Sequence, residues 1–196
     1  MKSSPLLLAL ALGMAAIASP VRAADTAAQA LPGQSLYHLQ AGFTDQGGHA
    51  LQWHDLRGRP QLVSMLYTNC HLMCPLIVEN AKGVQKQLTP AQREKLGIAM
   101  LSLDPARDTP AVMADMARRH RVGDGWRFLQ PDADDVPALA NVLDVRYRFR
   151  EDGSINHTSA LVLLDADGRI LARSEVNSAV PDPAFIDDVR KALAGG

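Results

Sequence analysis

Two cysteines separated by three residues are the side chains of this sequence best suited to chemistry. Cys70 and Cys74 are its only cysteines, and they lie between an apolar run, residues 62–67, and Pro75. Proline is favoured at the first position of a helix, because its missing N–H needs no partner there. We therefore expect both sulfurs at a strand-to-helix turn, where unpaired N–H groups stabilise a thiolate and lower the thiol pKa.

This spacing leaves two kinds of chemistry open. Residues four apart at the start of a helix face the same side, which allows a reversible disulfide and equally allows two thiolates to hold one ion. Soft thiolate ligands favour Cu(I), with zinc as a competitor. A structural disulfide across so short a loop would add little stability through chain entropy. We therefore interpret the pair as chemical, against the simpler alternative of two inert buried cysteines.

A histidine far along the chain is expected to join the cysteines. His157 lies just before an apolar run, residues 160–164, and we expect the loop before this strand to lie beside the cysteine turn. Two thiolates and one imidazole would leave an open coordination position, which suits transfer of a metal better than a closed structural site. Taken alone, a histidine in such a place is more often a surface or capping residue.

Residues near these motifs have less certain roles. His71 and Met73 lie between the cysteines and are borderline or soft ligands, but we expect Met73 to pack against the core and His71 to be solvated. Asp104 could belong to a polar loop at the edge of the sheet, and its role stays open. Residues 108–110 are expected to end this loop, with Thr109 as the cap of the next helix.

The elements that must position these residues alternate between strand-like and helix-like patterns. Strands are predicted at residues 50–54, 62–67, 98–103, 126–129, 160–164 and 169–172, with 147–149 extended, and helices at 75–88, from Thr109, at 135–143 and from Pro183. A βαβ unit followed by a hairpin and a helix is the order of a thioredoxin-like domain. The predicted fold class is therefore α/β, with a central mixed sheet flanked by helices and an N-terminal extension.

The first 23 residues have the layout of a secretory signal peptide. Lys2 precedes an apolar stretch, residues 6–18, and small residues precede a cut after Ala23. The stretch is shorter than the roughly 20 residues of a spanning helix, so we expect cleavage and no stable membrane anchor. The expected organisation is a signal peptide at residues 1–23, a flexible leader at 24–34 and one thioredoxin-like domain at 35–196.

The net charge and the expected export argue against a nucleic acid partner and for redox or metal chemistry. The chain has 196 residues, with 20 basic and 21 acidic side chains and a formal net charge of −1. Cleavage after Ala23 removes Lys2 and Arg22 and no acids, which leaves 18 against 21 and a charge of −3. This mild charge gives no reason to expect a nucleic acid partner. Export to the periplasm places the cysteines in an oxidising compartment, which favours redox or metal work.

Three ordered motifs resemble the Sco/SenC family over about residues 35–193. They are Tyr67-Thr68-Asn69-Cys70 with Cys74-Pro75, then Leu103-Asp104-Pro105 with Arg107-Asp108-Thr109-Pro110, and finally His157-Thr158-Ser159 before Leu163-Leu164-Asp165 with Asp167-Gly168. The resemblance implies a thioredoxin-like fold that binds one copper ion through Cys70, Cys74 and His157. Family members assist assembly of the binuclear copper centre of cytochrome c oxidase, and some reduce disulfides.

Two positions depart from the family pattern. Residues 71–73 read His-Leu-Met where the family often has Pro-Asp-Ile, and Asn156 stands where an aspartate commonly precedes the histidine. The first change could retune the copper site, and the second removes a charge beside the imidazole. Neither alters the three expected ligands, but both leave the identity of the target open.

The sequence thus predicts a periplasmic metallochaperone of Sco/SenC type. Copper, with Cu(I) favoured over Cu(II), would be delivered to the copper-bearing subunit of cytochrome c oxidase or to another periplasmic copper protein. If the protein also reduces disulfides, Cys70 and Cys74 form the redox pair and Cys70 is the expected attacking thiol. The alternative is a metal-independent periplasmic thiol-disulfide oxidoreductase or thiol peroxidase. His157 discriminates between them, since a pure redox role has no evident need for it.

Overall fold

The computed structural model describes residues 30–195, and a compact unit begins at Leu31. The expected signal peptide and residues 24–29 of the expected leader lie outside this described part. At its start, Leu31 packs against the core, and the Pro32 carbonyl accepts a hydrogen bond from the Ser35 N–H at 2.9 Å. Among residues 30–195, no helix has the length and hydropathy that crossing a membrane requires.

Helices and strands alternate through most of the described chain. The strands are β1 (Gly42–Asp45), β2 (Ala50–Gln52), β3 (Gln61–Leu66), β4 (Gly97–Ser102), β5 (Trp126–Pro131), β6 (Tyr147–Phe149), β7 (Ile155–His157), β8 (Ala160–Leu164) and β9 (Ile170–Glu175). The helices are α1 (Met73–Lys86), α2 (Pro90–Lys95), α3 (Pro110–His120), α4 (Val136–Val142) and α5 (Pro183–Ala194). Short 3₁₀ helices are η1 (Leu36–His38), η2 (Trp53–Leu56) and η3 (Ala133–Asp135).

A mixed seven-stranded sheet, in the order β2-β1-β5-β4-β3-β8-β9, forms the centre of the described unit. Strands β3, β4 and β5 pair in parallel, while β1, β8 and β9 join antiparallel. Parallel neighbours need a crossover, which α1 and α3 supply. Because β3 and β4 run in the same direction, the segments that follow them emerge at one edge of the sheet. The predicted α/β, thioredoxin-like fold with a central mixed sheet is confirmed.

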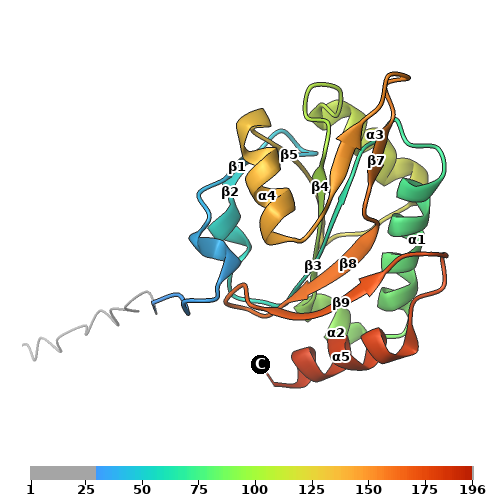
Figure 1. The fold of residues 1–196 in the computed structure, drawn as a ribbon. Helices are drawn as coiled ribbons and strands as arrows, with labels where there is room; N and C mark the ends of the chain where they lie inside the picture. Colours follow the sequence, from blue (N-terminus) through green and yellow to red (C-terminus); the bar gives the residue numbers. More distant parts are fainter. Residues whose placement is uncertain (1–29, 196) are drawn as a thin grey trace, which may run out of the picture. The chain divides into compact units, whose positions relative to one another are not determined.

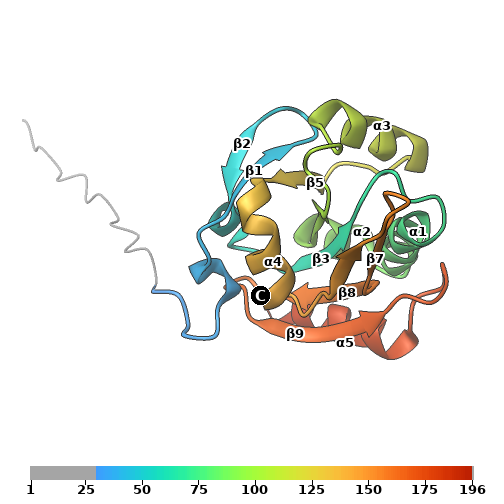
Figure 2. The same ribbon diagram turned by 45° about the horizontal axis from the view of Figure 1, so that its top comes forward.

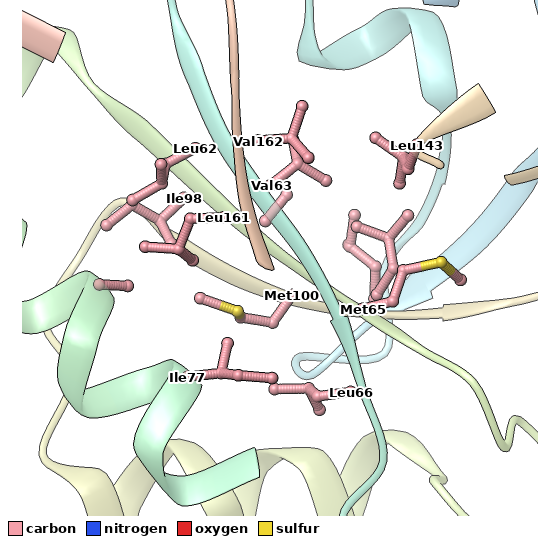
Figure 3. Packing of buried hydrophobic residues seen from close by; sticks show 14 of the residues in the cluster. Leu62, Val63, Met65, Leu66, Ile77, Ile98, Met100, Leu143, Leu161 and Val162 are labelled. Carbon is pink, nitrogen blue, oxygen red and sulfur yellow. The ribbon is translucent and has the colours of Figure 1, made fainter. Parts of the chain in front are cut away.

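Helices cover both faces of this sheet. Helix α4 lies on one face, and α1 with α3 lies on the other (Figures 1 and 2). Every residue of β3 is buried, as expected for a central strand covered on both sides. Figure 3 shows Leu66 of β3 beside Ile77 of α1, whereas Leu143 lies across the strand near Met65. The cysteine turn therefore starts from a strand that apolar packing fixes on both sides.

An N-terminal extension widens the sheet beyond β5. Strands β1 and β2 form a hairpin, and β1 pairs with β5. The strand predicted at residues 50–54 ends at Gln52, and η2 follows it. The indole N–H of the fully buried Trp53 donates to the Leu36 carbonyl at 3.0 Å, which holds η1 against η2.

Gly168 lets the turn between β8 and β9 lie directly against Tyr37. Its φ is +83°, and a Cβ there would lie 2.5 Å from Cδ2 of the buried Tyr37 ring. Gly48 has nearly the same φ, +84°, with open space around its Cβ position. We expect Gly48→Ala to lower the free energy of unfolding by about 1 kcal/mol through backbone strain, and Gly168→Ala to lower it by about 1–3 kcal/mol more through overpacking. Urea unfolding measures both, and equal losses would contradict the contact with Tyr37.

Candidate metal centre

Helix α1 begins at Met73, two residues before the predicted start, and Cys70 explains why. Leu72, at the N-cap position, makes no side-chain capping bond. Instead, the Cys74 backbone N–H donates to Cys70 Sγ at 3.3 Å. The sulfur thus satisfies one of the N–H groups that the first turn of a helix leaves unpaired.

The two cysteines differ in exposure and acidity. Cys70 is half-buried and Cys74 is fully buried. A hydrogen bond from the Cys74 thiol, joined by backbone N–H groups of residues 72–74, lowers the pKa of Cys70 to about 4 although burial opposes it. The same hydrogen bond, together with burial, raises the pKa of the Cys74 thiol. Cys70 is therefore the thiolate and the more accessible sulfur, whereas Cys74 retains its proton.

His157 ends β7 and presents one ring nitrogen to the cysteines. Its Nδ1 lies 3.0 Å from the Thr158 carbonyl oxygen, and because a carbonyl only accepts, Nδ1 carries the hydrogen. Burial lowers the pKa of His157, so the ring is neutral and Nε2 keeps a lone pair. Nε2 lies 3.6 Å from Cys74 Sγ. A fixed tautomer with one nitrogen free is the usual state of an imidazole that binds metal.

The three predicted ligands meet at one place as a thiolate, a thiol and a neutral imidazole. Their chemistry fits a soft ion such as Cu(I). The proton of Cys74 has two acceptors in reach, Cys70 Sγ and His157 Nε2, and it must leave before Cys74 can bind metal. Within residues 30–195, no three His, Cys, Asp or Glu side chains already form a group that could hold a metal ion. The ligand set therefore stays a prediction.

The cysteine turn and β7 enclose an open hollow of about 290 Å³. Leu72, which is 72% exposed, lines one side, and His157 lines the other. His71 is exposed, as expected for a solvated side chain. Met73 lines the hollow and lies outside the core cluster that it was expected to join. Cys70 is thus reached from solvent through a hollow lined by polar and apolar side chains, which a partner protein can cover.

Tyr67 connects the end of β3 to the strand that carries His157. Its hydroxyl accepts a hydrogen bond from the Ile155 N–H at 3.2 Å, and its ring meets the His157 ring edge to face at 5.9 Å. The Tyr67 N–H also donates to Cys74 Sγ at 3.5 Å. In both ribbon views the start of α1 lies beside β7 (Figures 1 and 2). Tyr67 therefore contacts His157 and Cys74 and also lies beside Cys70, a role that the sequence motif alone did not assign.

Asp108 positions the residue that precedes the cysteine turn. It is fully buried and accepts hydrogen bonds from the Thr68 N–H at 3.1 Å, the Thr68 hydroxyl and Ser102 Oγ at 2.6 Å. Burial raises the pKa of its carboxyl group. The sequence predicted only a role in ending the loop after β4, so this contact was missed. The neighbouring Thr109 caps α3, as predicted.

Asp104, whose role the sequence left open, belongs to a second polar link. Its carboxylate pairs with Arg107, which also donates to the Gly153 carbonyl at 2.9 Å. Gly153 lies in the turn between β6 and β7. The loop after β4 is thereby tied to the hairpin that ends in His157.

Comparison with known proteins identifies relatives along most of the chain. The family model described as SCO1/SenC matches residues 33–194. The SCO1 protein homolog of Bacillus subtilis is 26% identical over 155 residues, which are 76% of this chain and 79% of the relative.

Solved structures share the fold. The copper-bound ScoI of Bradyrhizobium japonicum has a TM-score of 0.62 and 24% identity, covering 79% of this chain and 98% of its own. BsSco, described with a disulfide switch as a member of the Sco family of cytochrome c oxidase assembly proteins, has a TM-score of 0.67 and 25% identity over 80% of this chain and 92% of its own. The match of the family model over residues 33–194 confirms the sequence resemblance, and the solved structures share the fold.

The acidity of Cys70 predicts an unusual alkylation profile. In the reduced, metal-free protein we expect iodoacetamide to modify Cys70 at a rate nearly constant from about pH 6 to 8, because its pKa is lowered to about 4. A thiol with the ordinary pKa of about 8.5 would react about tenfold faster for each pH unit in this range. Mass spectrometry of samples quenched at successive times gives the rates of modification. A Cys70→Ser variant is the control, since the remaining buried Cys74 should react slowly, and a steep rise in the intact pair would contradict the thiolate assignment.

Removing the Asp108 carboxylate should destabilise the fold around the cysteine turn. We expect Asp108→Ala to lower the free energy of unfolding by about 2–4 kcal/mol, because the donors Thr68 and Ser102 lose a buried acceptor. Asp115→Ala is the matched control, because Asp115 is 51% exposed and pairs only with surface arginines. It should lower stability by less than about 1 kcal/mol. Thermal and urea unfolding that showed equal losses would refute a supporting role for Asp108.

Proposed function

Because this chain belongs to the SCO1/SenC family, we propose that it carries one copper ion on Cys70, Cys74 and His157 and passes it to a protein acceptor. The observation that supports this most is the contact of His157 Nε2 with Cys74 Sγ at 3.6 Å, with Nδ1 held by a carbonyl. Thiol chemistry alone does not call for an imidazole with this fixed tautomer. The copper-bound ScoI, which shares the fold, supports the choice of metal.

The residues offer a route for loading and release. We propose Cu(I) as the main cargo, since two sulfurs and one nitrogen form a soft donor set, with Cu(II) as the alternative oxidation state. Cys70 offers a thiolate at once, whereas Cys74 first gives up its proton. Three donors leave room for an acceptor ligand. Handover then replaces each donor sulfur or nitrogen by one acceptor group, and the oxidation state of copper does not change.

The acceptor and the compartment complete the proposal. We propose the copper-bearing subunit of cytochrome c oxidase, or another periplasmic copper protein, as the acceptor, and the description of BsSco supports this choice. We propose that residues 1–23 direct export, that cleavage follows Ala23, and that the released protein works in the periplasm.

A second candidate function is reduction of the acceptor's own disulfide, which the unequal acidity of the cysteines favours. The Cys70 thiolate would attack one sulfur of the acceptor, forming a mixed disulfide and releasing one acceptor thiolate. Cys74, after losing its proton, would then attack Cys70 and release the second acceptor thiolate. Two electrons pass to the acceptor, and a Cys70–Cys74 disulfide remains. The acceptor thiolate released in the first step takes the proton of Cys74, so this exchange does not depend on His157.

Copper titration separates these functions. We expect the reduced protein to bind one Cu(I) per chain tightly under anaerobic conditions, and Cys70→Ser or Cys74→Ser to abolish this binding. His157→Ala should weaken binding by about 100-fold or more, since even groups that only orient a ligand contribute about 10- to 100-fold. Competition against a Cu(I) chelator, with metal analysis, measures the affinities.

His71→Ala is the matched control for the imidazole. His71 lies in the same turn but is exposed, so its removal should leave copper affinity unchanged. Disulfide exchange should persist in both His71→Ala and His157→Ala. No copper beyond background, together with a readily reversible Cys70–Cys74 disulfide, would overturn the copper proposal. A metal-independent thiol oxidoreductase would then be the better assignment.

A further inference from the structure

Two arginines on the hairpin that carries His157 have no partner in the described chain. Arg146 and Arg148 are exposed, and neither belongs to an ion pair within residues 30–195. They flank Tyr147, whose side chain shares one face of the ribbon with that of its pairing partner His157, so the two arginines share the other face with Asn156. Strand pairing of Tyr147 with His157 and of Arg148 with Asn156 holds them at a fixed distance from the candidate ligands. Their charges are therefore held in place beside the site.

The hollow beside the two arginines adjoins the hollow above the cysteine turn along β7. The two arginines line a hollow of about 390 Å³ whose wall includes Asn156 and His157. These same two residues line the hollow of about 290 Å³ above the cysteine turn. A surface that covers both hollows would touch the arginines, His157 and the exposed Leu72 together. Arginine and large apolar side chains around a water-excluding centre are typical of protein interfaces.

The positive charge is local and does not reflect the whole chain. The chain carries a formal charge of −1, so no general attraction to polyanions is expected. On the same hairpin, Glu151 and Asp152 line a hollow together with Arg148 and Arg150, and the charge of Arg150 acts on Asp152. The positive charges nearest His157 are thus those of Arg146 and Arg148, at the end of β6 that pairs with His157.

We propose that Arg146 and Arg148 dock an acidic surface of the protein that exchanges copper or electrons with Cys70 and Cys74. This inference rests on the proposed function for the identity of the exchanged group, and it adds the charge of the partner. Carboxylates around the acceptor's own site would pair with the two guanidinium groups and bring that site over the two hollows. Charge complementarity at a rim chiefly raises the association rate and selects the partner, and salt weakens it.

A pair of peptides tests the docking surface without copper. Both contain one acceptor-like segment with serines in place of cysteines, flanked by glutamates in one peptide and by glutamines in the other. We expect the metal-free protein to bind the glutamate peptide about tenfold more tightly at low ionic strength, and the preference to fall below about twofold at about 0.5 M salt. NMR titration or fluorescence anisotropy measures both affinities.

Charge variants identify the residues responsible. The double variant R146Q/R148Q should lose the preference for glutamate, whereas R150Q should keep most of it because Glu151 and Asp152 already offset that charge. The matched control is K86Q/K95Q, which removes two exposed charges near the end of α1 and in α2, away from β7 (Figure 1), and should behave as wild type. A preference that survives R146Q/R148Q, or equal binding of the two peptides by wild type, would overturn the proposal.

Two further measurements distinguish an acidic protein partner from a lipid surface, and the docking surface from the copper function. Arginine-dependent binding to phosphatidylglycerol vesicles with no preference between the peptides would assign the charges to a lipid surface and overturn a protein partner. Copper transfer is followed with dithiol versions of both peptides. Docking without any copper binding would refute the copper function and keep the acidic partner, whereas transfer at equal rates to both peptides would keep the copper function and refute the docking surface.

Discussion

The hydrogen bond from the Cys74 N–H to the Cys70 sulfur is the constraint on which the rest of the site depends. It caps α1 with a sulfur atom, so the helix starts at Met73 and carries Cys74 in its first turn. Because the Cys74 thiol and then the backbone N–H groups of the first turn donate hydrogen bonds to Cys70, the pKa of Cys70 is lowered and that of Cys74 is raised, so Cys70 becomes the thiolate and Cys74 keeps its proton. That proton, together with a buried neutral imidazole, fixes the order in which the three donors become available.

Polar links between distant segments hold this turn in register with the rest of the fold. Asp108 fixes Thr68 from the end of β4, Arg107 reaches the hairpin turn at Gly153, and Tyr67 bonds to Ile155. Each link spans an edge of the sheet where parallel strands end, which is where an α/β fold places its sites. Buried polar groups such as Asp108 and the Tyr67 hydroxyl are costly when half-satisfied, so these two links also favour one arrangement of the site over its alternatives.

The sequence predicted the strands that are buried on both faces of the sheet. It did not predict hydrogen bonds between residues that lie far apart in the sequence. Strands such as β3, covered on both faces, appear as continuous apolar runs. Thr109 marks the start of α3, because its side chain caps the helix locally. The capping box of Thr89 and Gln92 was a usable signal for α2 that the prediction left out. By contrast, the bond between Asp108 and Thr68 crosses 40 positions, and no local pattern encodes it. Likewise, the helix start depended on a sulfur that propensities do not treat as a cap.

Strands β6 and β7 form a two-stranded sheet of their own, separate from the seven-stranded one. The imidazole and the two sulfurs therefore belong to different structural parts, one a ribbon and the other a strand and helix anchored in the core. Changes in the length or twist of the ribbon can move His157 relative to the sulfurs while the sheet keeps its packing. Such modularity lets one scaffold diversify, in evolution or in the laboratory, between sites of different affinity and geometry without a new fold.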